Sequence, residues 1–341
     1  MNPEQNVDTL SGERLEVKTK KPEILYHYTD AAGFLGILKY GELWATEVRC
    51  MNDAQEIEFA AMIVAEESKE LGDKVLHEQK PDVAPPSDVH SILEWLRVNK
   101  STDDRKDEPG NVAWALYSIA LLFAGVATSK YSVNRDDTYA ACFTTQADSL
   151  GQWRGYAGGG GYAIGFRYET LSRFEIETTE QVVGEPRQVA YGKSGGKKEV
   201  VRFYEEFAGA LMSSAKKAKE LEATKDSQKD SSSIPKFSHR IAPNLSELAT
   251  VKHEAFSDEQ EWRLIYSESR GTGEHLGDFR PGGVGGIMPF IRLKLTKDSI
   301  ACVRVGPGEE TSLRVLMAEH ALARFGHLDV DVLTSDAPYR P

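Results

Sequence analysis

The stretch ILYHYTDAAGFLGILKYGELWAT, residues 24–46, predicts a strand, a helix and a second strand in close succession. Residues 24–29 have strand composition, and Asp30 is suited to cap a helix over residues 30–40. Gly41 follows that helix, where glycine readily adopts the left-handed conformation that ends a helix. The apolar side chains Phe34, Leu35, Ile37 and Leu38 share one helix face. The residues ELWAT then return as a strand.

The rest of the chain alternates helical and strand patterns. Helices are predicted from MNDAQE onward, with Asn52 or Asp53 as cap, and over residues 112–127, capped by Asn111. Strands are predicted at TYAACFTTQ, GYAIGFRY, EWRLIYS, ACVRV and LDVDVLT, with a helix at ETSLRVLMAEHALARFG. Asp148 and Ser149 are suited to cap a short helix between the first two of these strands. We expect a flexible arm over residues 1–22 and a single α+β domain over 23–341, with insertions near 72–131 and 213–250.

Composition limits the classes of function. The 341 residues carry a formal net charge of −12, which disfavours a general nucleic-acid-binding role. The three cysteines are far apart and have no zinc-ligand spacing, so we expect no metal site and a cytoplasmic location. The most apolar run, residues 112–127, is shorter than the ~20 residues of a membrane span, and a buried core helix is expected there.

Four clusters contain candidate functional residues: LYHYT, MNDAQE, CFTTQADSLGQWRGYAGGGGYAIGF and FSDEQEWRLIY. Taken singly, each has a structural explanation, because a histidine in a strand is usually a hydrogen-bonded core or surface residue. The glycine run at 158–161 does not match GxGxxG at a helix start and gives no support for a dinucleotide-binding βαβ unit. Together the clusters supply a histidine, paired glutamates and several aromatic side chains, the components of a ligand site.

These motifs resemble two known groups. LYHYTDAAGFLGILKYGELWAT is similar to the opening of the ADP-ribosyltransferase fold, in which a strand with H-[GY]-T precedes a helix and a second strand. MNDAQE, CFTTQADSLGQWRGYAGGGGYAIGF, FSDEQEWRLIY, VGPG and SDAPYR resemble the bacterial family called domain of unknown function 2971, from Glu23 onward. The resemblance implies an ADP-ribosyltransferase-like split β-sheet core of the H-Y-E type with helical insertions.

The resemblance also implies roles for particular residues. His27 would bind the ribose next to the nicotinamide, with Thr29 beside it, and Glu261 would stabilise the positively charged ribose of the transition state. Glu259 would be the first acid of an E-x-E pair that orients an acceptor. Trp44 stands where the family has a stacking tyrosine, and the aromatic candidates to replace that tyrosine are Tyr28, Trp153 and Tyr156.

A fixed carboxylate is physically suited to this chemistry, since breaking the nicotinamide–ribose bond leaves positive charge on the sugar. We expect the neutral imidazole of His27 to donate a hydrogen bond to a ribose hydroxyl while its other nitrogen is held by the backbone. Further polar candidates for the pocket are Asn52, Asp53 and Arg154, and Arg263 is a candidate partner for a phosphate. NAD is the expected substrate, without a metal.

The acceptor of ADP-ribose, a protein or a nucleic acid, stays open, as does the oligomeric state; no membrane partner is expected. By resemblance, a toxin or phage-defence role is expected, with an NAD glycohydrolase as a close variant. A non-catalytic sensor of a nucleotide or protein on the same fold is the main alternative. A nuclease or phosphatase would need clustered metal-binding carboxylates, but the sequence context of Asp53, Glu56 and Asp148 indicates helix caps instead.

Overall fold

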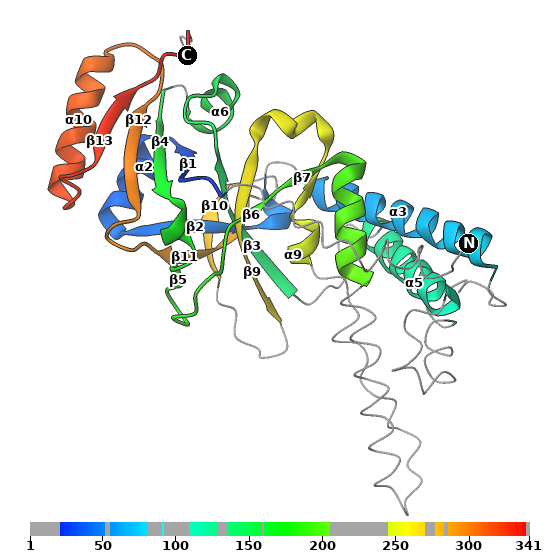
Figure 1. Ribbon diagram of the computed structural model, residues 1–341. Coiled ribbons are helices and arrows are strands. Elements are labelled where there is room, and N and C mark those ends of the chain that lie inside the picture. The colour runs from blue at the N-terminus through cyan, green and yellow to red at the C-terminus, as the bar shows by residue number, and fades with distance from the viewer. Residues whose placement is uncertain are drawn as a thin grey trace, which may run out of the picture. The chain divides into compact units, whose positions relative to one another are not determined.

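The computed structural model describes residues 21–51, 55–80, 91, 109–128, 136–158, 160–204, 245–269, 277–282 and 286–338 (Figure 1). Its contacts divide the chain into two units. Unit 1 comprises Met1–Val17, Gln55–Asn134 and Ala190–His253, and unit 2 comprises Lys18–Ala54, Arg135–Val189 and Glu254–Pro341. Both insertions expected from the sequence fall in unit 1. The expected arm, except its last two residues, Lys21 and Pro22, lies outside the described residues.

Unit 2 contains a mixed sheet with helices, as the α+β pattern predicted. Eleven described strands form this sheet, and eight of them follow one another in the order β10-β11-β2-β3-β1-β4-β12-β13. Their bounds are β1 Ile24–Thr29, β2 Glu42–Glu47, β3 Asp136–Thr144, β4 Tyr162–Arg167, β10 Asp278–Pro281, β11 Ile287–Lys294, β12 Ile300–Val305 and β13 Asp331–Thr334. The other three are β5 Glu175–Ile176 on β11, β6 Arg187–Gln188 on β9, and β9 Glu261–Ser269 on β3.

Helices pack against this sheet. They are α2 Ala31–Tyr40, α6 Leu150–Tyr156, α7 Tyr168–Leu171 and α10 Thr311–Arg324, with the 3₁₀ helices η1 Val48–Cys50 and η3 Glu254–Glu259. Helices α2 and α10 pack against the main core cluster, which includes Leu25, Phe34, Phe143, Ile164 and Leu322. In Figure 1, α10 lies beside β12 and β13. A smaller cluster joins α6 to the sheet through Tyr28, Trp153, Ala157 and Ala163.

The opening β1-α2-β2 segment forms as its caps predicted. The Asp30 side chain accepts a hydrogen bond from the Gly33 N–H at 2.7 Å, and α2 begins directly after it. Gly41 ends the helix with φ 64°, a conformation that carries a steric cost for residues with a Cβ. The pairing of β1 with β4 sets His27 opposite Ile164 and Thr29 opposite Tyr162. His27 and Thr29, two residues apart in β1, therefore share one face of the sheet.

The sheet is split along one edge of β3. All nine residues of β3 pair with β9, so its two other neighbours share the opposite edge. On that edge β2 pairs with Tyr139 and Ala140, whereas β1 pairs with Thr144. Within the described sheet, residues 141–143 thus have no strand partner on that edge. This opening between β1 and β2 matters for the site, because it exposes backbone groups that must find other partners.

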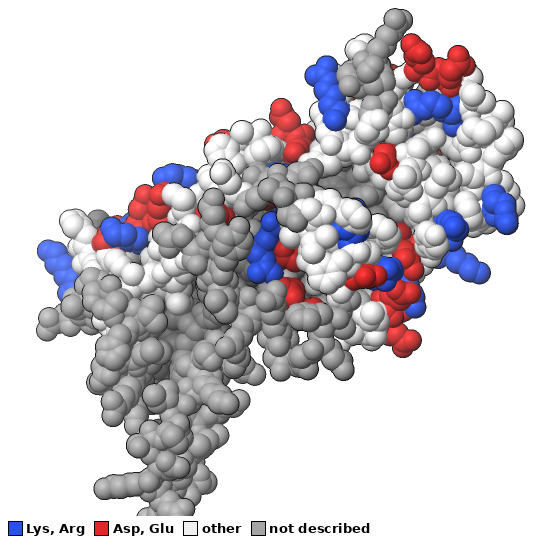
Figure 2. All heavy atoms as spheres, turned by 180° about the vertical axis from the view of Figure 1, so that it is seen from behind, with Lys and Arg blue, Asp and Glu red and all other residues white. Residues whose placement is uncertain are grey.

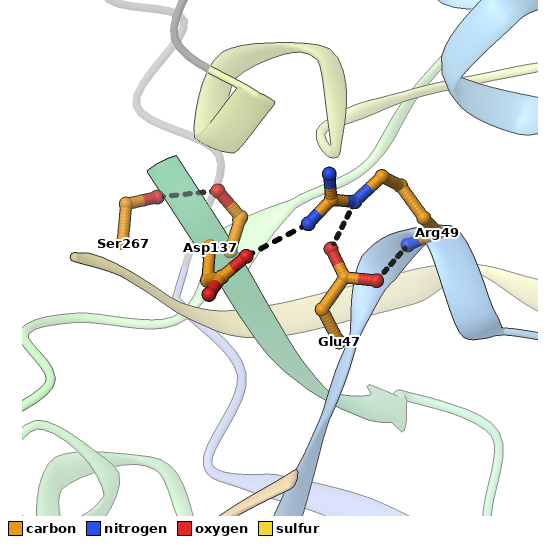
Figure 3. Close-up of polar contacts among 5 residues, drawn as sticks. Glu47, Arg49, Asp137 and Ser267 are labelled. Atoms are coloured by element: carbon orange, nitrogen blue, oxygen red, sulfur yellow. Dashed lines mark hydrogen bonds and ion pairs between the residues drawn. The ribbon is translucent and has the colours of Figure 1, made fainter. Parts of the chain in front are cut away.

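An ion-pair cluster stands where β2 ends and β3 begins (Figure 3). Arg49 reaches between two buried carboxylates, with Nε 2.6 Å from Glu47 Oε1 and Nη2 2.8 Å from Asp137 Oδ1. Burial raises the pKa of Glu47, and Arg49 opposes that rise. Beside the cluster the hydroxyls of Thr138 and Ser267 lie 2.7 Å apart. The chain leaves unit 2 after Ala54 and returns to it at Arg135. This cluster therefore links the end of the first segment of unit 2 to the start of the second.

Unit 1 is built around two long helices, α3 Glu56–Gln79 and α5 Pro109–Thr128, which run side by side. It also contains the helical residues 192–204, the short helix α9 Leu245–Leu248 and the parallel strand pair β7 Ala190–Tyr191 and β8 Val251–Lys252. The predicted cap Asn111 proves to lie inside α5, because the fixed φ of Pro109 suits a first helical turn. Among the described helices, α5 contains one stretch, Gly110–Ala127, that is long and apolar enough to cross a membrane, and 61% of this stretch is buried inside the protein.

Candidate functional site

His27 lies at the split in the sheet and bonds its exposed backbone. Its Nδ1 is 2.9 Å from the carbonyl oxygen of Cys142, in the part of β3 that lacks a strand partner. Because a carbonyl only accepts, Nδ1 must carry the hydrogen, and in the neutral ring Nε2 is then an acceptor. The hydrogen bond expected between His27 and a ribose hydroxyl must therefore run in the opposite direction. With Nδ1 donating to the backbone, Nε2 of the neutral ring cannot donate to a hydroxyl, but it can accept a hydrogen bond from one.

The surroundings of His27 favour the neutral imidazole. Burial lowers its pKa, the hydrogen bond to Cys142 opposes this, and the positive charge of Arg280 lowers it further. The ring also packs on Phe143, with centroids 5.9 Å apart. The histidine is therefore held by a backbone bond and an aromatic neighbour, and stays uncharged at neutral pH.

Glu261 begins β9 and is fixed by an arginine two residues away. Arg263 donates from Nε to Oε1 at 2.7 Å and from Nη2 to Oε2 at 2.9 Å. Residues two apart in a strand share a face, and this two-point geometry orients the carboxylate. Glu261 is 6% exposed and Arg263 is 1% exposed. The structure thus pairs Arg263, which the sequence offered as a phosphate partner, with the candidate catalytic acid.

The turn before Glu261 is clamped by the end of β3 and the two residues that follow it. Thr144 Oγ1 donates to the Glu259 carbonyl at 2.7 Å, and Gln146 Nε2 donates to the Asp258 carbonyl at 2.7 Å. Thr145 Oγ1 donates to the side chain of Gln260, also at 2.7 Å. Gln260 has φ 45°, a left-handed conformation that costs a non-glycine residue about 1–2 kcal/mol. The two glutamates are therefore held on either side of a strained residue.

These side chains converge on one small cleft. It offers about 60 Å³ of space to water-sized atoms, and it is lined by Tyr26, His27, Tyr28, Cys142, Phe143, Gln152, Tyr156, Glu259 and Glu261. The cleft thus brings together His27 and Glu261, which are 234 positions apart in the sequence. Typical ligand pockets measure several hundred cubic ångströms, so this cleft would hold one end of a larger ligand.

The electrostatic character of the cleft is acidic and aromatic. Two of its nine lining residues are glutamates, none is lysine or arginine, and three are tyrosines. Such a lining favours a cationic group, which both carboxylates and aromatic faces attract. Burial raises the pKa of Tyr28 to about 12. Its hydroxyl donates to the Gln146 carbonyl at 2.9 Å and accepts from the Ser149 N–H at 3.0 Å, which leaves it a structural phenol.

The aromatic candidates have different environments. Trp153 is fully buried and its indole N–H donates to Asp148 at 2.6 Å. Asp148 therefore anchors this tryptophan, and the Ser149 side chain makes no capping bond to α6. Tyr156 lines the cleft and is 41% exposed. Trp44 is equally exposed but lies outside the set of residues that line the cleft.

The remaining candidates fall outside this lining. Thr29, Arg154 and Arg263 do not line the cleft, and Asn52 and Asp53 lie outside the described residues. In the part of the chain that the structure describes, no three His, Cys, Asp or Glu side chains are placed to hold a metal ion.

Sequence reasoning missed four lining residues: Tyr26, Cys142, Phe143 and Gln152. Gln152 could have been predicted from the sequence, because it lies four residues before Tyr156 on α6 and therefore shares its helix face. Cys142 and Phe143 line the cleft because the sheet is split beside them, and no local sequence pattern predicts that split.

The distribution of charged side chains on one face of the molecule is relevant to nucleic-acid binding. Figure 2 shows Lys and Arg interspersed with Asp and Glu over the described residues visible there. That face has no broad basic field among those residues, which a phosphate backbone would need.

Comparison with known proteins gives one match. The model of a family described as "Protein of unknown function (DUF2971)" matches residues 152–264. No curated protein and no solved structure matches the chain. The matched stretch contains Gln152, Tyr156, Glu259 and Glu261 of the cleft and leaves His27 outside. One side of the cleft is therefore drawn from a segment that is similar to this family of unknown function.

Proposed function

We propose that the cleft binds the nicotinamide end of NAD and cleaves the nicotinamide–ribose bond, with transfer of ADP-ribose to a macromolecular acceptor. The observation that supports this most is the presence of His27, Glu259 and Glu261 on one acidic, aromatic cleft. The nicotinamide ring of NAD is cationic, and the ribose becomes cationic as the bond breaks, so both gain from nearby carboxylates.

Each residue has a distinct role in this proposal. Glu261, oriented by Arg263, stabilises positive charge on the ribose, and His27 Nε2 accepts a hydrogen bond from a ribose hydroxyl. Tyr156 takes the stacking role, because its ring is half exposed and lines the cleft. Glu259 faces the same space and is the residue that would orient the acceptor. A role in toxicity or phage defence is part of the proposal by resemblance, and NAD hydrolysis by water is its nearest variant.

A second candidate is a nucleotide sensor without turnover. The pairing of Arg263 with both oxygens of Glu261 supports this alternative, since it partly neutralises the carboxylate that catalysis would use. The two candidates share the ligand and differ in chemistry.

Nicotinamide release from NAD by the purified full chain tests the proposal. We expect release by the wild type and a loss of about 100-fold or more for Glu261→Gln, as for removal of one transition-state contact. Glu254→Gln is the matched control, because Glu254 is exposed on η3 and lies outside the cleft lining. Absence of release, with thermal stabilisation by NAD retained, would reject the enzyme and favour the sensor.

A further inference from the structure

Arg280, on β10, is a half-buried cation without a carboxylate partner among the described residues. Its Nη2 donates to Thr46 Oγ1 at 2.8 Å. Its Nε is buried and has no hydrogen-bond partner among the described residues. Within the same described ranges no Asp or Glu lies within ion-pair distance of it, and burial lowers the pKa of its guanidinium. An uncompensated charge of this kind is costly unless an anion completes it.

Arg292, on the neighbouring strand β11, provides the contrast. It lies 2.6 Å from Asp278 and 3.6 Å from both Glu42 and Glu177. Three carboxylates therefore surround one guanidinium. Arg280 and Arg292 both stack on aromatic rings, so the difference between them is the supply of negative charge.

Trp44 gives Arg280 an aromatic platform. The Arg280 Cζ lies 5.6 Å from the centroid of the Trp44 ring. That ring in turn packs on the buried Phe290, with centroids 4.4 Å apart. Trp44 is 41% exposed, so a firmly held indole and an uncompensated guanidinium stand together at the surface.

Strand register places this pair on the face of the sheet that carries Glu261. Arg280 is opposite Met288 on β11, and Phe290 on the same face of β11 is opposite Thr46 of β2. Thr46 is opposite Ala140 of β3, and four residues along β3 Thr144 is opposite Glu261. The pair thus lies across the split from β1. The charge of Arg280 also lowers the pKa of His27, so the pair is within electrostatic reach of the cleft.

We propose that Arg280 and Trp44 form a binding site for the diphosphate of a nucleotide, beside the cleft and on the face of the sheet that carries Glu261. The guanidinium would bind phosphate oxygens through its Nη groups, since Nε is buried, while the indole would contact the adjoining sugar or base. The site deepens the proposed function, on which it rests for its nucleotide, because the cleft itself holds no cation that could bind a diphosphate.

Binding of ADP to the full chain, measured by calorimetry, tests the site without any turnover. Arg280→Gln should weaken ADP binding by about 10- to 100-fold, as expected when a charged hydrogen-bond donor is lost. Arg173→Gln, which removes an exposed arginine paired with Asp298, should stay within about twofold of wild type. Equal affinities for wild type and Arg280→Gln, or equal losses in the two variants, would overturn the proposal.

A second measurement uses the folded wild type, in case Arg280→Gln does not fold. Inorganic pyrophosphate should change the tryptophan fluorescence of the wild type, and that change should vanish in Trp44→Phe. The same change in both proteins would also overturn the site.

Nicotinamide release is measured in parallel. If ADP binding depends on Arg280 but the protein releases no nicotinamide, the diphosphate site is sustained and the enzyme is rejected. If the wild type releases nicotinamide but Arg280→Gln binds ADP as tightly as the wild type, only the diphosphate site is rejected.

Discussion

His27 and Glu261 line one cleft although strand register places them on opposite faces of the sheet. His27 is opposite Ile164, which belongs to the main core cluster. Tyr26, which alternates with His27, is opposite Thr144, and Thr144 is opposite Glu261. The two side chains reach the same space because the sheet is split between β1 and β2. The split is therefore the structural feature on which the site depends.

The half-buried His27 should make stability depend on pH. Its lowered pKa means that the unfolded chain binds more protons than the folded chain below about pH 6.5, the unperturbed histidine value. Folding free energy should therefore be lost as the pH falls through this range. His27→Asn keeps an N–H donor but does not titrate, so it should flatten the dependence. Burial also lowers the pKa of His327, which leaves a residual slope of the same sign in the variant.

Urea unfolding between pH 5 and pH 8 measures both slopes. An unchanged slope in His27→Asn would show that His27 keeps an ordinary pKa in the folded protein.

The Arg263–Glu261 pair should couple strongly in stability. Arg263→Gln leaves the buried Glu261 carboxylate without its guanidinium, and we expect a loss of about 3–5 kcal/mol in the free energy of unfolding. The double variant, with Glu261→Gln added, removes the charge as well and should recover at least about 1 kcal/mol. Denaturant unfolding of the four proteins of this cycle gives the coupling, and additive losses would contradict the pairing.

The clamp on the Glu259–Glu261 turn should depend mainly on Thr144. Thr144→Val keeps the shape of the side chain but removes the hydroxyl that bonds the Glu259 carbonyl, and it should cost about 1–2 kcal/mol because that hydroxyl is buried. Thr145→Val removes an exposed bond to Gln260 and should cost less than about 0.5 kcal/mol. Denaturant unfolding compares the pair, and equal costs would argue against the clamp.

Arg49 should stabilise unit 2 more than an exposed arginine does. Arg49→Ala leaves Glu47 and Asp137 buried without their cation and should cost about 2–4 kcal/mol. Arg173→Ala breaks an exposed pair with Asp298 at 3.8 Å and should cost less than about 1 kcal/mol. Thermal and urea unfolding monitor both variants; a loss no larger in Arg49→Ala than in Arg173→Ala would mean that solvent satisfies the two acids.

Local signals in the sequence were enough for the first elements and for one acid of the site. Asp30 and Gly41 mark the ends of α2, and the pattern EWRLIYS begins β9 at Glu261. Strands β10 and β11 escaped prediction, because the glycines before them and Pro289 within β11 interrupt the strand pattern. Arg280 was missed for that reason.

The convergence of the site could not be predicted from local patterns either. It depends on which strands share an edge of β3, and that is decided by register between segments more than a hundred residues apart. Arg154, Trp44 and Trp153 carried the right chemistry for a pocket, but packing directs them elsewhere than the cleft lining.

The affinity for NAD in a cycle of His27→Asn, Glu261→Gln and the double variant tests most directly whether the two residues act on one ligand. Calorimetric titration of the full chain gives the four dissociation constants. If both side chains contact the same ribose, the two losses should be non-additive by about 1 kcal/mol, the magnitude expected for residues that share a partner. Losses that simply add, or a wild type that does not bind NAD, would contradict the account.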